Sequence, residues 1–412
     1  MTATVRNYIV VTGAYWGFTL VDGALRMLVL LHFFQLGYTP FTLAFLFLLY
    51  EAAGIGANLA GGWLASRFGI PRMLAVGQSL QIAGLIMLSL LDPGWGAVAS
   101  VIWVVAAQGI AGVAKDVTKT ASKSAIKATA AEGSGQLFRW VAWFTGSKNA
   151  MKGIGFFVGG LLLEWVGFQA ALWLMAGFLA VILVAGLLLL PSALGKAKSS
   201  KSVKELFGKS RGVNLLAAAR IFMFGARDVW FVVGLPVFLY ASGWRFLEVG
   251  AFLAIWTIAY GGIQAIAPVL VTRSEDGLSR EIPAARLWAG LLTAVPIVLV
   301  LMMQTPALWR PDLVVVIGLA IFGLPFAVNS SLHSYLILAY AGSEKAAEDV
   351  GFYYAANATG RLMGIVLSGL LYQFGGMTAC LIGSAAMLAI CWIVTFLLPT
   401  GVQPAVTRQR MA

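Results

Sequence analysis

Long apolar runs separated by short breaks fill almost the whole chain. Each run reaches about 20 mostly apolar residues, the length that a helix needs to cross a bilayer. Only 11% of the 412 residues are charged, whereas about 25% are charged in an average soluble domain. We therefore predict an all-α integral membrane protein with about twelve transmembrane helices. The expected spans are 8–35, 41–64, 73–91, 96–114, 138–165, 168–190, 215–240, 246–271, 284–303, 312–334, 351–374 and 378–398.

The breaks between these runs carry turn-forming residues. They are Gly37-Tyr38-Thr39-Pro40, Asp92-Pro93-Gly94, Gly167 and Gly375-Gly376. The longest interior connection is polar and basic, and it follows the sixth predicted helix. We therefore expect a six-helix half over 1–190, a basic cytoplasmic linker over 191–214, and a second six-helix half with a short tail over 215–412.

Lysine and arginine are distributed very unevenly among the predicted connections. With both termini cytoplasmic, 20 of the 28 lie on the cytoplasmic side, two (Arg245 and Arg310) lie outside, and six lie in spans. Because Lys and Arg accumulate in cytoplasmic loops, this excess predicts the orientation. The first run is long enough to span and shows no clear cleavage site, so we expect the first helix to be retained. The expected location is the inner (plasma) membrane of a bacterium.

The two halves resemble each other weakly. At an offset of 206 residues, Gly37-Tyr38 aligns with Gly243-Trp244, and Asp22 aligns with Asp228. At an offset of 209, Lys152 aligns with Arg361, Gly155 with Gly364, and Gly160 with Gly369. Helices 1 and 5 are thus expected to repeat as helices 7 and 11 in parallel orientation. Two six-helix halves related in this way are the layout of the major facilitator fold.

A local motif agrees with that fold. The segment from Gly62 to Gly69, with Arg72 beyond it, resembles the major-facilitator signature of the loop between helices 2 and 3. The resemblance implies a gating loop built from Gly62, Arg67, Gly69 and Arg72. Ser66 stands where the family has Asp, which removes the basis for the usual charge contact of that loop. Similarly, Val105 stands in helix 4 where an Arg is common.

Charged residues also occur inside the predicted spans. A charge at the bilayer centre costs about 2.5–3.5 kcal/mol on insertion scales, so such residues need partners, water or a function. Predicted helices 3, 6, 9 and 12 carry none, and in the major facilitator fold those four helices form the outer scaffold. The mid-span charges are Asp22, Arg26, Glu51, Lys148, Lys152, Arg220, Arg227, Asp228 and Arg361.

The basic residues in this set outnumber the acids. Asp22 and Arg26 are spaced i and i+4, so they can pair on one helix face; for this pair and for Arg227–Asp228, a structural role and a substrate-binding role are both open. Lys148, Lys152 and Arg361 lack enough acidic partners, so we expect an anion, and the arginine fork suits phosphate. Buried carboxyls can exchange protons as their pKa shifts. The predicted substrate-binding residues are Lys148, Lys152, Arg227, Arg361, Arg220, Arg26, Asn357 and Tyr353, and the predicted proton-coupling residues are Asp22, Glu51 and Asp228.

Two further patterns have more than one interpretation. Lysines recur every four residues at the inner end of the fourth helix, at Lys115, Lys119, Lys123 and Lys127. Anchoring to anionic lipid and an electrostatic funnel for an anion, or a dock for a partner, are both open. Gly155-xxx-Gly159 allows close helix contact, which we expect within one chain, so the protein is expected to be a monomer.

Other functional classes are disfavoured by the sequence. Cys380 and Cys391 lie about 16 Å apart on one predicted helix, beyond disulfide reach, and no His/Cys metal cluster is present. Gly208-Lys209-Ser210 lacks the upstream glycine of a P-loop, because Val203 occupies that position. No nucleophile and base converge as a catalytic site requires. We therefore expect no enzyme activity, no catalytic residue, no cofactor, no metal and no nucleic acid.

Beyond the general fold, the chain resembles one subfamily nearly end to end. The resemblance lies in VTGAYWGFTLVDGALRMLVLLHFFQLGY (11–38), AKDVTKTASKSAIK (114–127), GSKNAMKGIGFFVGG (146–160) and FGARDVWFVVGLPVFLY (224–240). These stretches are similar to organoarsenical efflux permeases of the ArsJ type. The resemblance implies export of 1-arseno-3-phosphoglycerate, a product of glyceraldehyde-3-phosphate dehydrogenase acting on arsenate, and hence arsenate resistance. The link to that enzyme is functional and need not be physical. Another organophosphate or organic-anion carrier of the same fold is the alternative.

Overall fold

The computed structural model describes residues 3–56, 69–129, 136–191, 209–271, 274, 278–304, 310–340 and 346–400. Every regular element in these ranges is a helix, as the apolar runs predict. The elements are α1 (Ala3–Gln35), α2 (Pro40–Leu46), α4 (Ile70–Ser89), α5 (Ala97–Thr129), α6 (Gln136–Trp165), α7 (Gly167–Leu189), α8 (Arg211–Phe231), α9 (Gly234–Ala241), α10 (Phe246–Leu270), α11 (Glu281–Met303), α12 (Pro311–Tyr340) and α13 (Ala346–Phe396).

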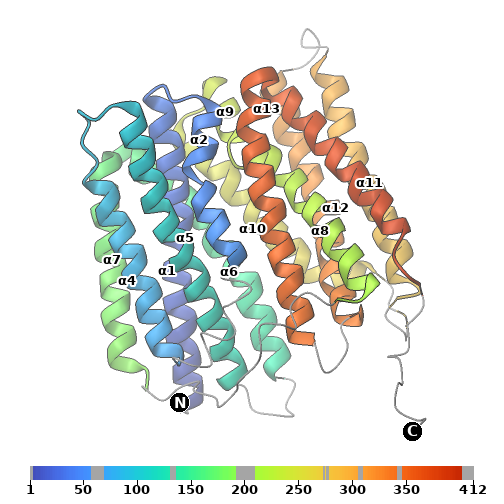
Figure 1. Ribbon diagram of the computed structural model, residues 1–412, viewed down its shortest axis with the longest axis horizontal. Coiled ribbons are helices and arrows are strands. Elements are labelled where there is room, and N and C mark those ends of the chain that lie inside the picture. The colour runs from blue at the N-terminus through green and yellow to red at the C-terminus, as the bar shows by residue number, and fades with distance from the viewer. Residues whose placement is uncertain are drawn as a thin grey trace.

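These elements form the twelve rods that the sequence predicts, within the described residues. A helical segment over 48–56 continues α2, α9 continues α8, and α13 consists of two arms. Nine of the described helices are long and apolar enough to cross a membrane. The rods run side by side: in Figure 1 the helices α1, α4, α5 and α7 lie on the left, α8, α11 and α12 lie on the right, and α2, α6, α9 and α10 lie between them. The lower end of the bundle in Figure 1 is the end at which α1 begins, and the upper end is where α1 ends.

Glycines mark the turns between rods, and their positions repeat between the halves. Gly37 and Gly243 have φ values of 84° and 92°, in the left-handed region that favours glycine. Gly167 and Gly376 have φ values of 78° and 60°, and they are separated by the offset of 209 that also aligns Gly155 with Gly364. The expected breaks at Gly37, Gly167 and Gly375-Gly376 are therefore confirmed, and the last of them folds α13 into a helical hairpin.

The seventh predicted span, expected as one helix over 215–240, is interrupted between α8 and α9. Pro236 is the third residue of α9, directly after this interruption, and has no backbone N–H to extend the helical hydrogen bonding. The N–H groups of Val233 and Gly234 instead donate to Oγ of Ser368 on α13, at 3.3 and 3.0 Å. A break at membrane depth is tolerated where its backbone groups are satisfied by the protein in this way.

Small residues bring helices 1 and 5 of each half into backbone contact. A Cβ added to Gly155 on α6 would lie 2.3 Å from the carbonyl oxygen of Leu20 on α1. In the second half, a Cβ added to Gly364 on α13 would lie 2.6 Å from the carbonyl oxygen of Gly225 on α8. The expected repeat of helices 1 and 5 as helices 7 and 11 is therefore present in the packing. The Gly155-xxx-Gly159 motif packs against α1 of the same chain, as expected.

The two halves meet along two equivalent helix pairs. A Cβ added to Gly160 on α6 would lie 2.6 Å from the carbonyl oxygen of Phe246 on α10, and one added to Gly369 on α13 would lie 2.6 Å from that of Pro40 on α2. Both contacts lie near the upper end of the bundle, where the Phe41 N–H also donates to Oε1 of Gln373. The halves are therefore closely packed at the upper end.

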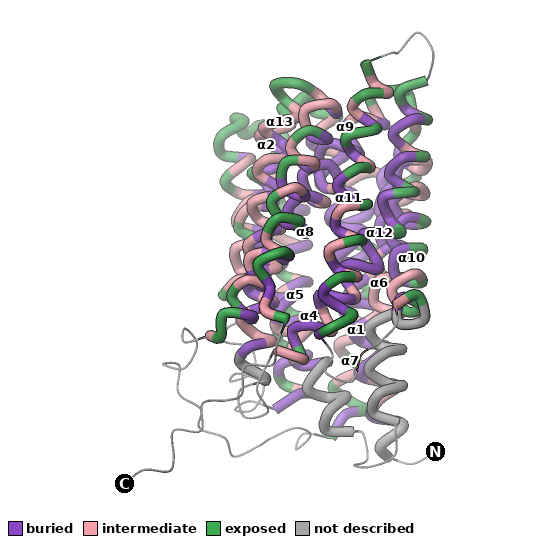
Figure 2. Tube along the Cα trace, turned by 90° about the vertical axis from the view of Figure 1, so that its right-hand side faces the viewer, coloured by how far each residue is buried: buried purple, intermediate pink, exposed green. Residues whose placement is uncertain are grey.

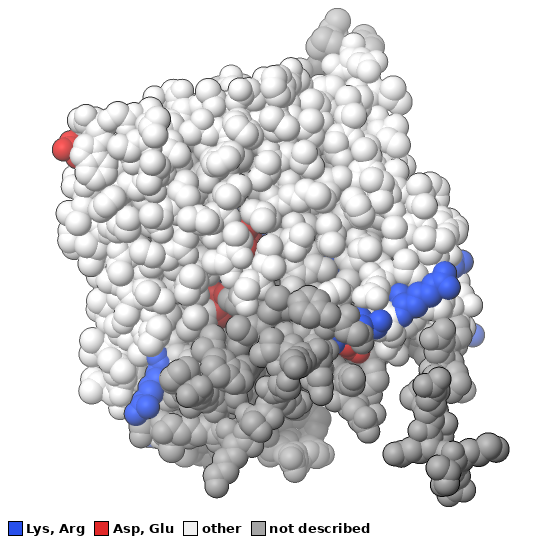
Figure 3. All heavy atoms as spheres, viewed as in Figure 1, with Lys and Arg blue, Asp and Glu red and all other residues white. Residues whose placement is uncertain are grey.

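The outermost rods face outward with apolar side chains. Less than a third of the apolar window of α7 and of α11 is buried, and Figure 2 shows exposed positions along the outward sides of the rods. On the face drawn in Figure 3, the described Lys and Arg lie in the lower half, and the surface above them is a broad, largely uncharged band with only small acidic spots near its middle and at the upper left. An uncharged band of this kind is what a bilayer requires of the surface that it covers.

Candidate binding cavity

A cavity of about 280 Å³ lies between the two halves. Its walls come from α1, the 48–56 segment, α5 and α6 on one side, and from α8, α10, α12 and the first arm of α13 on the other. Within the described residues, α4, α7, α11 and the second arm of α13 contribute nothing to the lining. The sequence predicted four scaffold rods because these rods lack charged residues. Among the residues that the structure describes, these same four rods do not line the cavity.

An aromatic layer closes the cavity on its upper side. Phe156 from one half and Phe231 from the other have ring centroids 6.0 Å apart. Phe231 in turn lies 5.1 Å from Trp256 on α10. Lining residues such as Lys119 and Gln264 extend the cavity from this layer toward the lower end.

The cavity lining carries more positive than negative side chains. Eight lining residues are Arg or Lys and four are Asp or Glu, a formal surplus of four positive charges. The basic ones are Arg26, Lys115, Lys119, Lys148, Lys152, Arg220, Arg227 and Arg361, and the acidic ones are Asp22, Glu51, Asp116 and Asp228. The structure therefore brings every predicted mid-span charge to one cavity.

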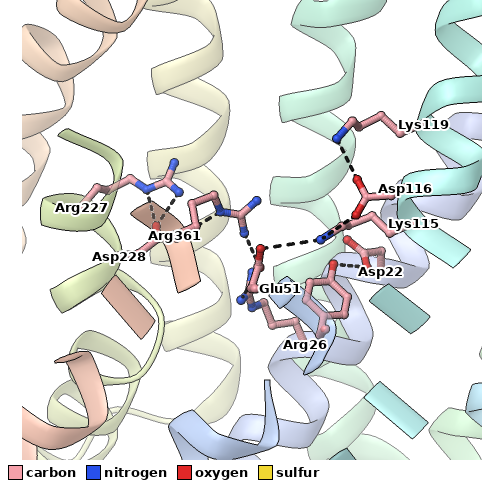
Figure 4. Close-up of polar contacts among 10 residues, drawn as sticks. Asp22, Arg26, Glu51, Lys115, Asp116, Lys119, Arg227, Asp228 and Arg361 are labelled. Atoms are coloured by element: carbon pink, nitrogen blue, oxygen red, sulfur yellow. Dashed lines mark hydrogen bonds and ion pairs between the residues drawn. The ribbon is translucent and has the colours of Figure 1, made fainter. Parts of the chain in front are cut away.

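Glu51 lies at the centre of a charge network that joins the two halves (Figure 4). Its Oε1 accepts hydrogen bonds from Arg26 at 3.1 Å and from Arg361 at 2.6 Å. Its Oε2 lies 3.7 Å from Nζ of Lys115. The side chain of Glu51 is only 1% exposed, so three cations from three different rods converge on one buried carboxylate. Arg361 belongs to the second half, so this carboxylate ties the halves together across the cavity.

Asp228 extends the network on the side of the second half. Its Oδ1 accepts from Nε of Arg227 at 2.7 Å, and its Oδ2 accepts from Nε of Arg361 at 3.1 Å. The expected Arg227–Asp228 pair therefore forms. The expectation that Arg361 lacks acidic partners is wrong, because Arg361 contacts both Asp228 and Glu51. Glu51 lies 310 residues from Arg361 along the chain, so spacing within one helix does not indicate this pair.

Asp22 and Arg26 do not form the pair that their i, i+4 spacing allows. Arg26 donates to Glu51, whereas the carboxylate of Asp22 accepts the hydroxyl proton of Tyr50. The guanidinium of Arg26 also lies 5.3 Å from the ring centroid of Phe47. The carboxylate that pairs with Arg26 therefore comes from the neighbouring 48–56 segment and not from its own helix. Asp22 makes no ion pair with any described residue.

The helix that carries the lysine repeat continues farther than the sequence indicated. The fourth span was expected to end at residue 114, but α5 continues to Thr129. Lys115 and Lys119 thus line the cavity, and they contact Asp116 at 3.9 and 2.8 Å. For these two lysines the structure favours a role in the cavity over lipid anchoring. The side chains of Lys123 and Lys127 lie outside the described residues.

Lys148 and Lys152 line the cavity from α6, on the side of the first half. The ammonium of Lys152 lies 5.7 Å from the ring centroid of Phe156 in the aromatic layer. Among the described residues, no carboxylate forms an ion pair with Lys152. The prediction that Lys152 lacks an acidic ion-pair partner therefore agrees with the described contacts.

Arg220 lines the second half and is held by neutral partners. Its Nε donates to Oδ1 of Asn357 at 3.0 Å, and its Nη1 donates to the carbonyl oxygen and to Oγ of Ser330 at 3.2 and 3.1 Å. Asn357 lines the cavity as predicted, whereas Tyr353 is fully buried behind Arg220 and Tyr354 takes a place in the lining.

Some expected features fall elsewhere. Gly62 and Arg67 of the gating-loop prediction lie outside the described residues, while Gly69 precedes α4 with a φ of 82° and Arg72 is exposed on its first turn. His333 is fully buried inside α12. Cys380 and Cys391 are free thiols. Sequence reasoning did not assign Tyr260, Gln264 or Asp116 to the site, although the four-residue lysine repeat marked the cavity face of α5.

The fold and the cavity agree with a comparison of the sequence with protein families. Residues 8–347 match the family model of the Major Facilitator Superfamily. The chain belongs to the major facilitator superfamily. It is accordingly a membrane transporter of the secondary type, and its cavity lies where the two halves of that fold meet.

Solved transporters share this architecture. A peptide transporter of the POT type in complex with sulfate matches with a TM-score of 0.71 at 14% identity, over 95% of this chain and 93% of that chain. A POT-family transporter in complex with 5-aminolevulinic acid matches with a TM-score of 0.70 at 14% identity, over 96% and 94%. The human organic anion transporter MFSD10 matches with a TM-score of 0.64 at 15% identity, over 96% and 100%. No curated protein matches the sequence. At these identities the likeness concerns the fold.

Proposed function

We propose that this transporter exports a small organic anion, and that the anion is the organoarsenical 1-arseno-3-phosphoglycerate. The observation that carries the proposal is the formal surplus of four positive charges in the cavity. A substrate with an arsenate and a phosphate end supplies the negative charge that this cavity lacks. Removing charge from water is costly unless it is paired, so the surplus favours a polyanion over a neutral or cationic substrate.

The resemblance to organoarsenical permeases supports the choice of anion. The four stretches that carry the resemblance include Asp22, Arg26, Lys115, Lys119, Lys148, Lys152, Arg227 and Asp228. All eight line the cavity. The sequence likeness thus includes the surface that would meet the substrate as well as residues that pack helices.

The proposed transport cycle follows from the two ends of the bundle. The cavity extends toward the lower end, where α1 begins, and the halves are closely packed at the upper end. With the orientation predicted from Lys and Arg, this arrangement loads substrate from the cytoplasm. Rocking of one half against the other then opens the upper end.

Proton coupling is part of the proposal, and Asp22 is its best-placed carboxyl. Glu51 and Asp228 are each held by at least two described cations. Asp22 has a hydroxyl partner and no described cation partner. We therefore assign proton exchange to Asp22.

The proposal is tested by expression in an arsenate-sensitive bacterium, with and without added glyceraldehyde-3-phosphate dehydrogenase. Arsenate resistance that requires both proteins is the expected result. Uptake or exchange of glycerol phosphate by vesicles, with no arsenate phenotype, would instead support the alternative of a general organophosphate carrier. The R361Q variant serves as the loss-of-function comparison. It removes a cavity cation and should abolish resistance while the protein still reaches the membrane.

A further inference from the structure

The four cavity arginines fall into two classes. Arg26, Arg227 and Arg361 each contact at least one carboxylate. Arg220 is 5% exposed and, within the described part of the chain, forms no ion pair. Arginine stays protonated in proteins, so the charge of Arg220 is buried and balanced only by neutral dipoles.

The guanidinium of Arg220 is fixed in position. Asn357 and Ser330 accept its Nε and Nη1 protons. Its central carbon lies 3.9 Å from the ring centroid of Phe224 and 5.0 Å from that of Tyr353. The Nη2 group has no hydrogen-bond acceptor among the described residues, and Arg220 lines the cavity. Two N–H donors of a rigid, charged fork therefore remain for a ligand.

Hydrogen-bond donors are in excess around Ser330. Its Oγ lies within hydrogen-bond distance of three donors: Nη1 of Arg220 at 3.1 Å, the hydroxyl of Tyr260 at 3.3 Å, and Nε2 of Gln264 at 3.2 Å. A serine hydroxyl has two acceptor lone pairs, so it does not satisfy three donors at once. Tyr260 and Gln264 also line the cavity, so at least one of these donors is available to an acceptor there.

We propose that Arg220, Tyr260 and Gln264 form an oxyanion site for a phosphate-type group at one end of the substrate. Three donors that reach the same region from α8 and α10 match the several oxygens of a tetrahedral oxyanion better than the two of a carboxylate. The second charged end of the substrate lies toward Lys152, on the opposite wall. This inference rests on the proposed function, because it assigns one end of that anion to a defined part of the cavity.

The Glu51 network leaves this site intact. Glu51 and Asp228 form ion pairs with the other three cavity arginines, and neither carboxylate contacts Arg220. An entering anion therefore meets Arg220 without displacing a carboxylate. Arg220 is thus the first anchor in the second half, whereas Arg361 becomes available only when its ion pairs open.

The test is binding of glycerol 3-phosphate and inorganic phosphate to the purified full chain, measured by calorimetry. R220K keeps the charge but loses the fork, and it should weaken binding about 10- to 100-fold, as expected for a lost charge-assisted hydrogen bond. Y260F should weaken binding several-fold and stay folded, because the ring remains. R310Q is the control, since the Arg310 side chain is 73% exposed near the upper end of α12.

Each outcome decides one of the two proposals. Weakened binding in R220K and Y260F, with R310Q unchanged, supports the oxyanion site. Binding within twofold of the parent protein in R220K and Y260F overturns the site and leaves the proposed function standing. If R220K does not fold, the Y260F and Q264A variants decide in the same way. A parent protein that binds neither probe overturns the proposed anion specificity and the site with it.

Discussion

Replacing Glu51 with glutamine removes the negative charge that ties the two halves together. Arg361 keeps Asp228 at 3.1 Å, and Lys115 keeps Asp116 at 3.9 Å. Arg26 loses its described carboxylate partner. Breaking a buried ion pair costs about 3–5 kcal/mol. Since two of the three cations retain an acid, we expect a cost near the lower limit, about 3 kcal/mol.

The same change alters substrate binding in the opposite direction. E51Q raises the formal surplus in the cavity from four positive charges to five. It also frees Arg361 from its 2.6 Å contact with Glu51. An anion then competes with one carboxylate for Arg361 instead of two, so we expect E51Q to bind glycerol 3-phosphate about tenfold more tightly. Turnover should fall, because the empty carrier has lost the ion pair between its halves.

Thermal unfolding in detergent and calorimetric binding measure these two effects on the same sample. Without anion, E51Q should unfold at a lower temperature than the parent protein. Adding the anion should raise the unfolding temperature of E51Q by more than it raises that of the parent. E248Q is the matched control, because the Glu248 side chain is 44% exposed beside Arg245 and such pairs contribute about 0–1 kcal/mol. An E51Q protein with unchanged melting and unchanged affinity would refute the role of Glu51.

Three further predictions use other parts of the structure. D22N should bind anion normally but lose the response of transport to a pH gradient in vesicles; a retained response assigns coupling elsewhere. G155L should give no folded protein in a detergent gel-filtration assay, because a Cβ at that site lies 2.3 Å from a backbone oxygen of α1, whereas G177L, with no atom within 4 Å, should fold. K115C in a background without other cysteines should react with a membrane-impermeant thiol reagent from the cytoplasmic side; labelling from outside alone would contradict the proposed orientation of the cavity.

Most of the helical framework was predictable because it depends on local properties. The break at Gly375-Gly376 follows from two adjacent glycines between apolar runs, and Gly376 does adopt a positive φ. The positions at which helices end were harder to predict from the sequence. Nothing between residues 114 and 129 stops a helix, so α5 continues through its lysines. The interruption after α8 depends on Ser368, a residue far away in sequence.

The residues of the site were largely predictable, but their partners were not. A charged residue in a membrane span is costly enough to indicate a cavity, and all of the predicted mid-span charges line one. Spacing along one helix led to the wrong partner for Arg26 and left Arg361 without one. Both arginines contact Glu51, which belongs to a different rod from either.

The sequence alone determined that this chain crosses a membrane many times, where its helices break, and which rods carry charge into the interior. These properties follow from the length, hydropathy and glycine content of each segment. Only the tertiary structure decided which charges neutralise each other, and that Arg220 rather than Arg361 is the arginine held by neutral groups. The rotation and crossing of packed rods set the distances between side chains, and no single segment carries that information.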